Sequence, residues 1–276
     1  MNNALKSELF RLRRRPQTWI MPILSVAFIA FFYAILYLVY QFGSEDDQPG
    51  LRDSIEVGNI FENGMQIFGF FGSILVVIVT ASLIGSEYGW NTIRPLVARA
   101  QSRVGLLSAK WIVVALYTVF MVIVGIVGSL SLAAIFSVFT EGGLSSLPGG
   151  FWMDVVVGTG RWIVASLPYA AIGFAAALLA RSNAAGIAIG IGISFVESLI
   201  FPLLTFVSDI FDTVQQFGIS WNAEQLVSIS TQPEESFFDP VSASQAWQST
   251  AVLTVYMVVI VAATFIVFKR RDIISG

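Results

Sequence analysis

The sequence predicts an all-α integral membrane protein in which an interfacial N-terminal helix precedes six transmembrane helices. Hydrophobic residues make up 56% of the 276 residues and charged residues only 12%, and the mean hydropathy is +0.78. A soluble domain that hides only its core is not this apolar. The apolar residues fall into six runs, each near the roughly 20 residues that a helix needs to cross a bilayer. The basic residues gather in alternate connections between these runs.

The six expected transmembrane helices comprise residues 19–40, 66–84, 111–139, 162–180, 184–207 and 250–268. The third run is long enough to tilt or to continue beyond the bilayer, and its glycines allow it to bend. We find no repeat of fixed period and no low-complexity linker in the sequence. Residues 1–276 are therefore expected to form a single transmembrane domain.

The distribution of positive charge predicts that both termini are cytoplasmic. Of the 15 Lys and Arg residues, all but Arg52 and Arg161 lie in the N-terminal segment, the 86–110 loop, the turn at Arg181 or the C-terminal end. Cytoplasmic segments of plasma-membrane or inner-membrane proteins carry such an excess. The other connections are rich in Asp and Glu, which would either gather cations at the outer face or simply keep these loops solvated.

Residues 1–16 predict an amphipathic helix in the membrane interface. Leu5, Leu9 and Leu12 recur at helical spacing, and basic residues occupy most of the remaining faces, among them Arg13, Arg14 and Arg15. The leucine stripe would sink to the acyl boundary while the cations meet anionic lipid head groups, and Pro16 would turn the chain into the membrane. The alternative is a charged tail that only fixes orientation.

The residue inventory argues against an enzyme. The chain has no cysteine and no histidine, which excludes disulfides, thiolate metal sites and catalytic pairs that need His or Cys. No G-x-x-x-x-G-K-[ST] sequence occurs, so the chain is not expected to bind ATP itself. An aspartyl-type intramembrane hydrolase needs two carboxylates at matching depth, and only Glu197 lies near the middle of an apolar run.

The fifth apolar run carries two further candidates. Gly186 and Gly190 form a small-xxx-small pattern that lets a helix approach a neighbour closely, either in the same subunit or in a second one. The carboxylate of Glu197 costs about 3 kcal/mol at that depth, so it needs a polar cavity, a partner or a proton. We consider a role in a transport pathway, or a structural hydrogen bond to groups freed by Pro202. Pairing with Arg161 would require a shifted register.

The last exterior connection, residues 208–249, is rich in Phe and Trp. A loop this aromatic is expected to contain short helices on the outer leaflet, which would either roof a central cavity or pack against neighbouring loops.

The 86–110 loop is the one internal connection rich in positive charge. Gly89 is expected to permit a sharp bend, and Asn91 or Thr92 to cap a short helix with Pro95 in its first turn. This spacing directs one set of side chains toward solvent or lipid phosphate (Arg94, Arg99 and Arg103) and another inward (Ile93, Leu96, Val97 and Leu106). The alternative is that the basic residues are only a topology signal.

The loop also carries a longer pattern. It reads E-Y-G-W-x-T-x-R-x-L-x-x-R-x-x-x-R-x-x-x-L-x-A-K from Glu87 to Lys110, and the last apolar run ends in Phe268-Lys269-Arg270-Arg271-Asp272-Ile273. With the N-terminal helix and six apolar runs, this resembles the permease family of type-2 ABC exporters. Ala100 and Gln101 stand where members often carry Gly or Pro.

The resemblance implies that two permease subunits pair in the membrane, as a homodimer or heterodimer, each seated on a separate ATPase that binds ATP and Mg. The loop would be the coupling helix that receives the ATPase movement, through Glu87, Tyr88, Gly89, Trp90, Thr92, Arg94, Arg99, Arg103 and Lys110. Members export lipids, polysaccharides, peptides, antibiotics or other hydrophobic compounds, and some are linked to sodium extrusion. We expect a hydrophobic or amphipathic substrate, lipids as neighbours and no nucleic acid; the alternative is a non-transporting scaffold or assembly factor.

Overall fold

The computed structural model describes residues 2–43, 48–60, 63–99, 102–140, 147, 149–200, 203–204, 208, 210–228 and 243–270. Every regular element in these ranges is a helix, which confirms the all-α prediction. Among the described residues, five helical stretches are long and apolar enough to cross a membrane, namely Gln17–Phe42, Val57–Gly89, Arg103–Phe139, Phe151–Ala180 and Gln245–Arg270. The protein is therefore a multispan helical membrane protein.

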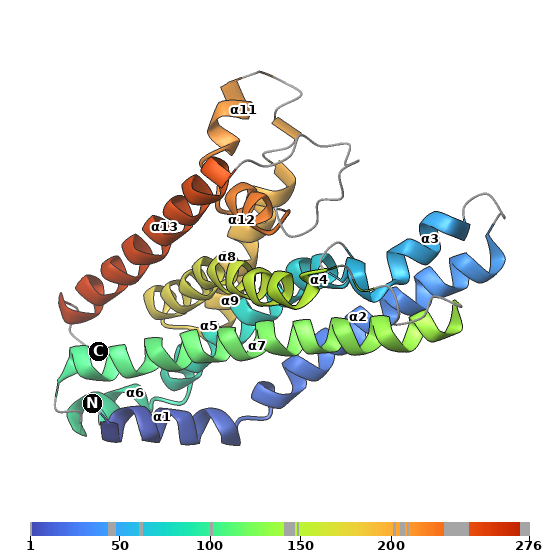
Figure 1. Cartoon of the computed structure of the whole chain (residues 1–276). Helices are drawn as coiled ribbons and strands as arrows, with labels where there is room; N and C mark the ends of the chain where they lie inside the picture. Colours follow the sequence, from blue (N-terminus) through green and yellow to red (C-terminus); the bar gives the residue numbers. More distant parts are fainter. Residues whose placement is uncertain are drawn as a thin grey trace.

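The helices follow one another along the chain as labelled in Figure 1. They are α1 (Asn2–Arg14), α2 (Gln17–Phe42), α3 (Gln48–Ile55), α4 (Gly64–Ile67), α5 (Ser73–Gly89), α6 (Ile93–Arg99), α7 (Arg103–Phe139), α8 (Phe151–Ala180), α9 (Asn183–Phe195), α11 (Ile210–Gln215), α12 (Ile219–Ser228) and α13 (Ala243–Arg270). A short 3-10 helix, η1 (Val57–Asn59), precedes α4, and two π-helical turns, η2 (Phe68–Gly72) and η4 (Val196–Ile200), follow α4 and α9.

Most helices extend further than the apolar runs predicted. α7 begins at Arg103 rather than at residue 111, and α8 begins at Phe151 rather than at residue 162. A hydropathy pattern detects only the part of a helix that matches hydrocarbon, and polar residues continue the backbone hydrogen bonding beyond it. The run at 184–207 is different, because it contains the 13-residue α9 and then the π-helical η4. A sixth spanning helix therefore stays a prediction.

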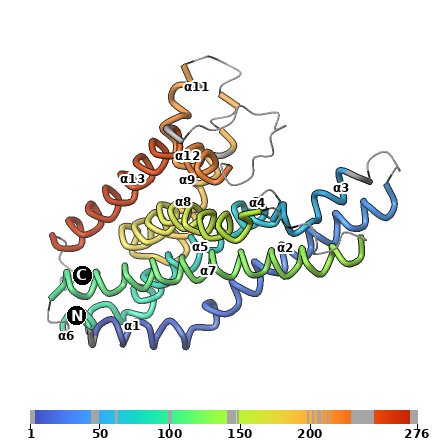
Figure 2. The backbone as a smooth tube through the Cα atoms, viewed as in Figure 1, coloured from blue at the N-terminus to red at the C-terminus, as the bar shows by residue number. Residues whose placement is uncertain are grey.

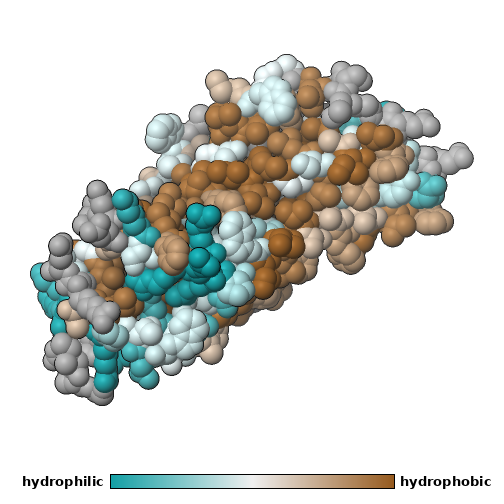
Figure 3. All heavy atoms as spheres, turned by 90° about the horizontal axis from the view of Figure 1, so that it is seen from below, coloured by the Kyte–Doolittle hydropathy of each residue, from teal (hydrophilic) through white to brown (hydrophobic). Residues whose placement is uncertain are grey.

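α5 lies at the centre of the fold. It contacts α8 and α9 on one side and α2 and α7 on the other, while α12 and α13 pack on α8 (Figure 2). Apolar side chains cover most of the face shown in Figure 3, and hydrophilic residues gather at one end of it. The N-terminal helix α1, the short helix α6 and the C-terminal end of α13 lie toward the same end of the molecule (Figure 1).

Close helix contacts explain several glycines. A Cβ at Gly186 would lie 2.5 Å from the Cα of Ala177 in α8, and a Cβ at Gly190 would lie 2.6 Å from Val77 in α5. Gly85 is similar, since its Cβ would lie 2.5 Å from the Cα of Asn183. The predicted close approach of the Gly186 and Gly190 face is thus confirmed, and its neighbours are helices of the same chain.

Candidate functional site

A buried charge cluster joins the end of α5 to α1 and α7. Glu87, in the last turn of α5, is only 2% exposed. Its Oε1 lies 2.5 Å from the Nζ of Lys110 in α7 and 3.3 Å from Nη1 of Arg11 in α1. Glu8 completes the cluster, with its Oε1 3.0 Å from Lys110 Nζ and 2.9 Å from Arg11 Nη2. Such charge-assisted contacts fix the three helices to one another.

Arg15 adds a third cation to the two carboxylates. Its Nη1 donates to the backbone oxygen of Ser82 and to the hydroxyl of Ser86, both at 2.9 Å, and its guanidinium lies 5.8 Å from the centre of the Trp90 ring. Burial lowers the pKa of Arg15, and the carboxylates of Glu87 and Glu8 act in the opposite direction. Arg15 remains charged because a guanidinium starts from a very high pKa.

The cluster corrects the prediction for the N-terminal helix. α1 ends at Arg14 and α2 begins after Pro16, so the turn at the proline is confirmed. Leu12 is 7% exposed and packs in the protein core, with Leu5 and Leu9 half-buried beside it. The leucine stripe thus packs at least in part against the protein, where α1 contacts mainly α7.

The basic residues at the end of α1 and directly after it divide into two groups. Arg13 and Arg14 are exposed, and Arg14 lies 5.2 Å from the ring of Phe10. Arg15, which was predicted to meet lipid head groups, instead binds α5. Sequence reasoning missed Glu8 and Arg11; their spacing signals an ion pair along α1, but not the contacts with Glu87 and Lys110.

The turn before α6 differs from the prediction at one residue. Gly89 belongs to α5, and its backbone has no unusual conformation. The left-handed residue is Asn91, with φ of 54°, a conformation that Asn tolerates better than most residues. The amide and hydroxyl of Thr92 both donate to the carbonyl oxygen of Glu87, at 2.9 and 3.3 Å. Thr92 therefore fastens the turn to the residue at the centre of the charge cluster.

The short helix α6 presents one buried and one exposed face. Ile93 and Val97 are 6% and 8% exposed and Arg94 points to solvent, as the helical spacing predicted; Pro95, in the first turn, is exposed as well. Among the other predicted site residues, Tyr88 is half-buried and Trp90 is 68% exposed. The side chain of Arg99 lies outside the described part of the structure.

Two basic residues of the predicted loop belong to α7. Arg103 is half-buried at the start of this helix, whose first turn is capped by the Ser102 hydroxyl accepting from the amide of Gly105 at 2.9 Å. Lys110, counted in the basic loop from its sequence position, is 4% exposed and points inward to the carboxylates. Lys110 is therefore not part of a docking surface.

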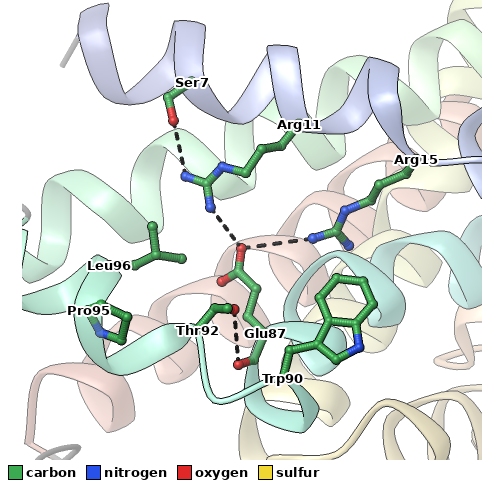
Figure 4. Close-up of a pocket in the computed structure, with 8 residues that line it drawn as sticks. All are labelled: Ser7, Arg11, Arg15, Glu87, Trp90, Thr92, Pro95 and Leu96. Carbon is green, nitrogen blue, oxygen red and sulfur yellow. Dashed lines mark hydrogen bonds and ion pairs between the residues drawn. The ribbon is translucent and has the colours of Figure 1, made fainter.

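An open pocket of about 430 Å³ lies between α1, the end of α5 and α6. Figure 4 shows Glu87 between Arg11 and Arg15, with Thr92 and Trp90 below it. The lining residues are Ser7, Arg11, Arg15, Glu87, Trp90, Thr92, Pro95 and Leu96. The arrangement offers an exposed aromatic ring and a short helix beside a buried charge cluster.

Glu197 lies apart from this cluster and makes a structural contact. Its Oε1 accepts a hydrogen bond from the backbone amide of Ile219, at the start of α12. The structural interpretation is thus supported, with α12 as the partner, while Pro202 lies outside the described residues. Asp154 acts electrostatically on Arg161, in the same helix, α8.

The connection predicted to be exterior contains short helices, as its aromatic residues predicted. α11 and α12 lie within 208–228, and residues 229–242 are outside the described part of the chain. α12 buries Ile219, Leu226 and Val227 and packs on α8 and α13. This contact supports packing against neighbouring elements as the role of this segment.

Fold and site together define a multispan helical membrane protein with an exposed short helix held on a buried charge cluster. Residues 53–274 match the model of DUF2705, described as a protein of unknown function, and the chain belongs to this family. The matched residues include Glu87, α6 and Lys110. Helix α1, which contains Arg11, and Arg15 directly after it precede the matched residues. No curated protein matches the chain.

Proposed function

We propose that this chain is the membrane-spanning subunit of an ATP-driven ABC exporter that moves a hydrophobic or amphipathic substrate. In this proposal a separate ABC ATPase binds ATP and Mg, a second permease subunit completes the transporter, and both termini of the chain face the cytoplasm. The resemblance of the 86–110 segment supports the proposal. A non-transporting scaffold or assembly factor is the second candidate.

The observation that carries the proposal is the way α6 is mounted. Its apolar face is buried through Ile93 and Val97, so it cannot slide freely over the protein. Directly before it, Glu87 binds α1 and α7 at once. A displacement applied to α6 would pass to α5 through the hydrogen bonds from Thr92 to Glu87, and from Glu87 to α1 and α7 through its ion pairs. This is the mechanical property that a coupling helix needs.

The exposed face of α6 and its preceding turn would receive the ATPase. Trp90 is 68% exposed, and Arg94 points to solvent one turn later. Trp and Arg are the residue types that most often dominate the binding energy of protein interfaces. The buried residues of the charge cluster would support this surface and make little contact with the partner.

We expect the double variant Trp90→Ala/Arg94→Ala to bind the ATPase at least about tenfold more weakly, because each side chain is exposed and of a type that commonly contributes above 1 kcal/mol. The protein is purified from its native host, and the co-purification of an ABC ATPase and the rate of ATP hydrolysis are measured. Arg13→Ala, which removes an exposed arginine from α1, is the matched control and should retain binding.

Equal ATPase binding by the double variant and the control would contradict the assignment of this surface. An ATPase that binds the wild-type protein without any change in its hydrolysis rate would favour the scaffold. An ATPase that never co-purifies would exclude the proposed function.

Orientation is tested by cysteine labelling, which is direct here because the chain has no cysteine. Arg94 and Glu224 are both exposed and lie in segments predicted on opposite sides of the membrane. A membrane-impermeant maleimide should label Glu224→Cys in intact cells, and Arg94→Cys only after permeabilisation, because charge places the 86–110 segment inside. The reverse labelling would overturn the predicted topology.

A further inference from the structure

The outer face of α1 is basic and lies opposite the face that docks on the protein. Side chains on it recur at i, i+4, i+7 and i+8, a spacing that forms one stripe along a helix. This basic stripe consists of the four exposed residues Lys6, Phe10, Arg13 and Arg14. The acidic residue of α1, Glu8, is buried on the other face. Figure 3 views the molecule from the side on which α1 lies, and hydrophilic residues there border a largely apolar surface.

An exposed aromatic ring lies within the basic stripe. Phe10 is 60% exposed, and the guanidinium carbon of Arg14 lies 5.2 Å from the centre of its ring. This contact limits the freedom of the guanidinium group, while the N–H groups at its edge can donate to an anion. Phenyl rings together with basic side chains are typical of helices at a membrane surface. The stripe therefore has the composition of a surface that meets lipid head groups.

Trp19 joins the basic stripe to the first spanning helix, α2. Its indole Nε1 donates to the backbone oxygen of Arg13 at 3.0 Å, and the residue is 52% exposed. The ring also packs edge-on against Phe120 of α7, with 6.4 Å between the ring centres. Trp is enriched at the level of lipid head groups because its ring is apolar and its N–H group is polar. We therefore expect Trp19 at head-group depth, directly beside Arg13.

An apolar track continues from Trp19 along α2. Ile20 and Ile23 are 53% and 69% exposed, and their spacing places them on the same side of the helix as Trp19. α2 is one of the helices long and apolar enough to cross a membrane. The basic stripe and the apolar track thus meet at the turn around Pro16. A ligand that fits both parts has a negative head and a hydrocarbon tail.

Other occupants fit only one part of this surface. A soluble anion, whether phosphate or an acidic peptide, would bind the cations and leave the exposed Trp and Ile side chains uncovered. An uncharged lipid would cover these apolar side chains and leave the cations without a counter-charge. Only an amphiphile with a negative head matches the charge and the apolar area together.

We propose that the outer surface at the junction of α1 and α2 binds an anionic phospholipid. Its head group lies on the cations of the basic stripe, and its acyl chains follow the apolar track of Trp19, Ile20 and Ile23. The sequence pattern assigned membrane contact to the leucines of α1, whereas this site uses the opposite face of that helix. The inference is independent of the proposed export function, because binding requires neither an ATPase nor transport.

The test uses the full chain, reconstituted in vesicles of equal amounts of phosphatidylglycerol and phosphatidylcholine with the same acyl chains. The protein is extracted in mild detergent, and native mass spectrometry counts the lipids that it retains. We expect the wild-type protein to retain phosphatidylglycerol at least about tenfold over phosphatidylcholine, since each basic side chain near the head groups contributes about fivefold. Arg13→Ala/Arg14→Ala should reduce the preference to less than about twofold, and Arg13→Lys/Arg14→Lys should keep most of it.

Lys269→Ala/Arg270→Ala is the matched control, because it removes two exposed basic residues from the end of another helix, α13. The neighbouring Phe268 is only 3% exposed, so this control should keep the preference for phosphatidylglycerol. An unchanged preference in the α1 alanine variant, or an equal loss in both alanine variants, would overturn the inference. Displacement of the lipid by water-soluble glycerol phosphate would also overturn it, since the site would then bind the anion without the acyl chains. An unchanged melting temperature in the alanine variants verifies that they are folded.

Discussion

Replacing Glu87 by alanine should destabilise the protein by about 3–5 kcal/mol, as is typical when one partner of a buried ion pair is removed. The substitution leaves Lys110, which is only 4% exposed, and Arg11 facing each other with Glu8 as the remaining nearby carboxylate. Arg15 also loses its electrostatic attraction to Glu87. A chemical unfolding titration in mild detergent measures the change, and proteolysis of α1 reports its release from α5.

Two further variants make this result interpretable. Glu56→Ala breaks the pair with Arg52, 3.7 Å apart and partly exposed, and should cost less than about 1 kcal/mol. In Glu87→Ala/Lys110→Met, a buried cation is removed together with the anion, so the double variant should recover part of the stability lost by the single one. A loss for Glu87→Ala no larger than for Glu56→Ala would mean that the cluster does not fasten α1.

The sequence predicted the helical class and the approximate centres of the long helices, because hydrocarbon thickness imposes a length on every apolar run. It placed Ile93 and Val97 inward correctly, since their i, i+4 spacing puts both on one face of α6, and Leu106, also predicted inward, is buried in α7. It did not predict that α1 docks on the protein. An amphipathic helix has the same pattern whether its apolar stripe meets lipid or another helix.

The candidate site was likewise predicted only in part from the sequence. Glu87 was identified because it begins the residue pattern of the basic 86–110 loop. Its partner Arg11 is 76 residues away, and only tertiary contacts bring the two together. Lys110 was assigned to an exposed loop because the sequence alone does not show whether a basic residue at the edge of an apolar run is buried. The bend assigned to Gly89 occurs at Asn91, since a glycine permits a left-handed conformation without requiring it.

Gly186→Val should destabilise the bundle by about 1–3 kcal/mol or more, because overpacking forces backbone shifts. A Cβ at Gly186 would lie 2.5 Å from both the Cα and the Cβ of Ala177, and the backbone of α8 cannot rotate away as a flexible side chain would. α8 also contacts α5, α12 and α13, so its displacement would spread through the core. Thermal unfolding in detergent measures the loss.

Gly192→Val is the matched control, because it places the same β-branched side chain in the same helix where nothing lies within 4 Å. Both variants share the change in helix propensity, so the difference between them measures the contact with α8 alone. Equal stability of the two proteins would contradict the tight packing of α9 within the chain. A change of oligomeric state in Gly192→Val, without loss of stability, would show that the outer face of α9 also receives a second subunit.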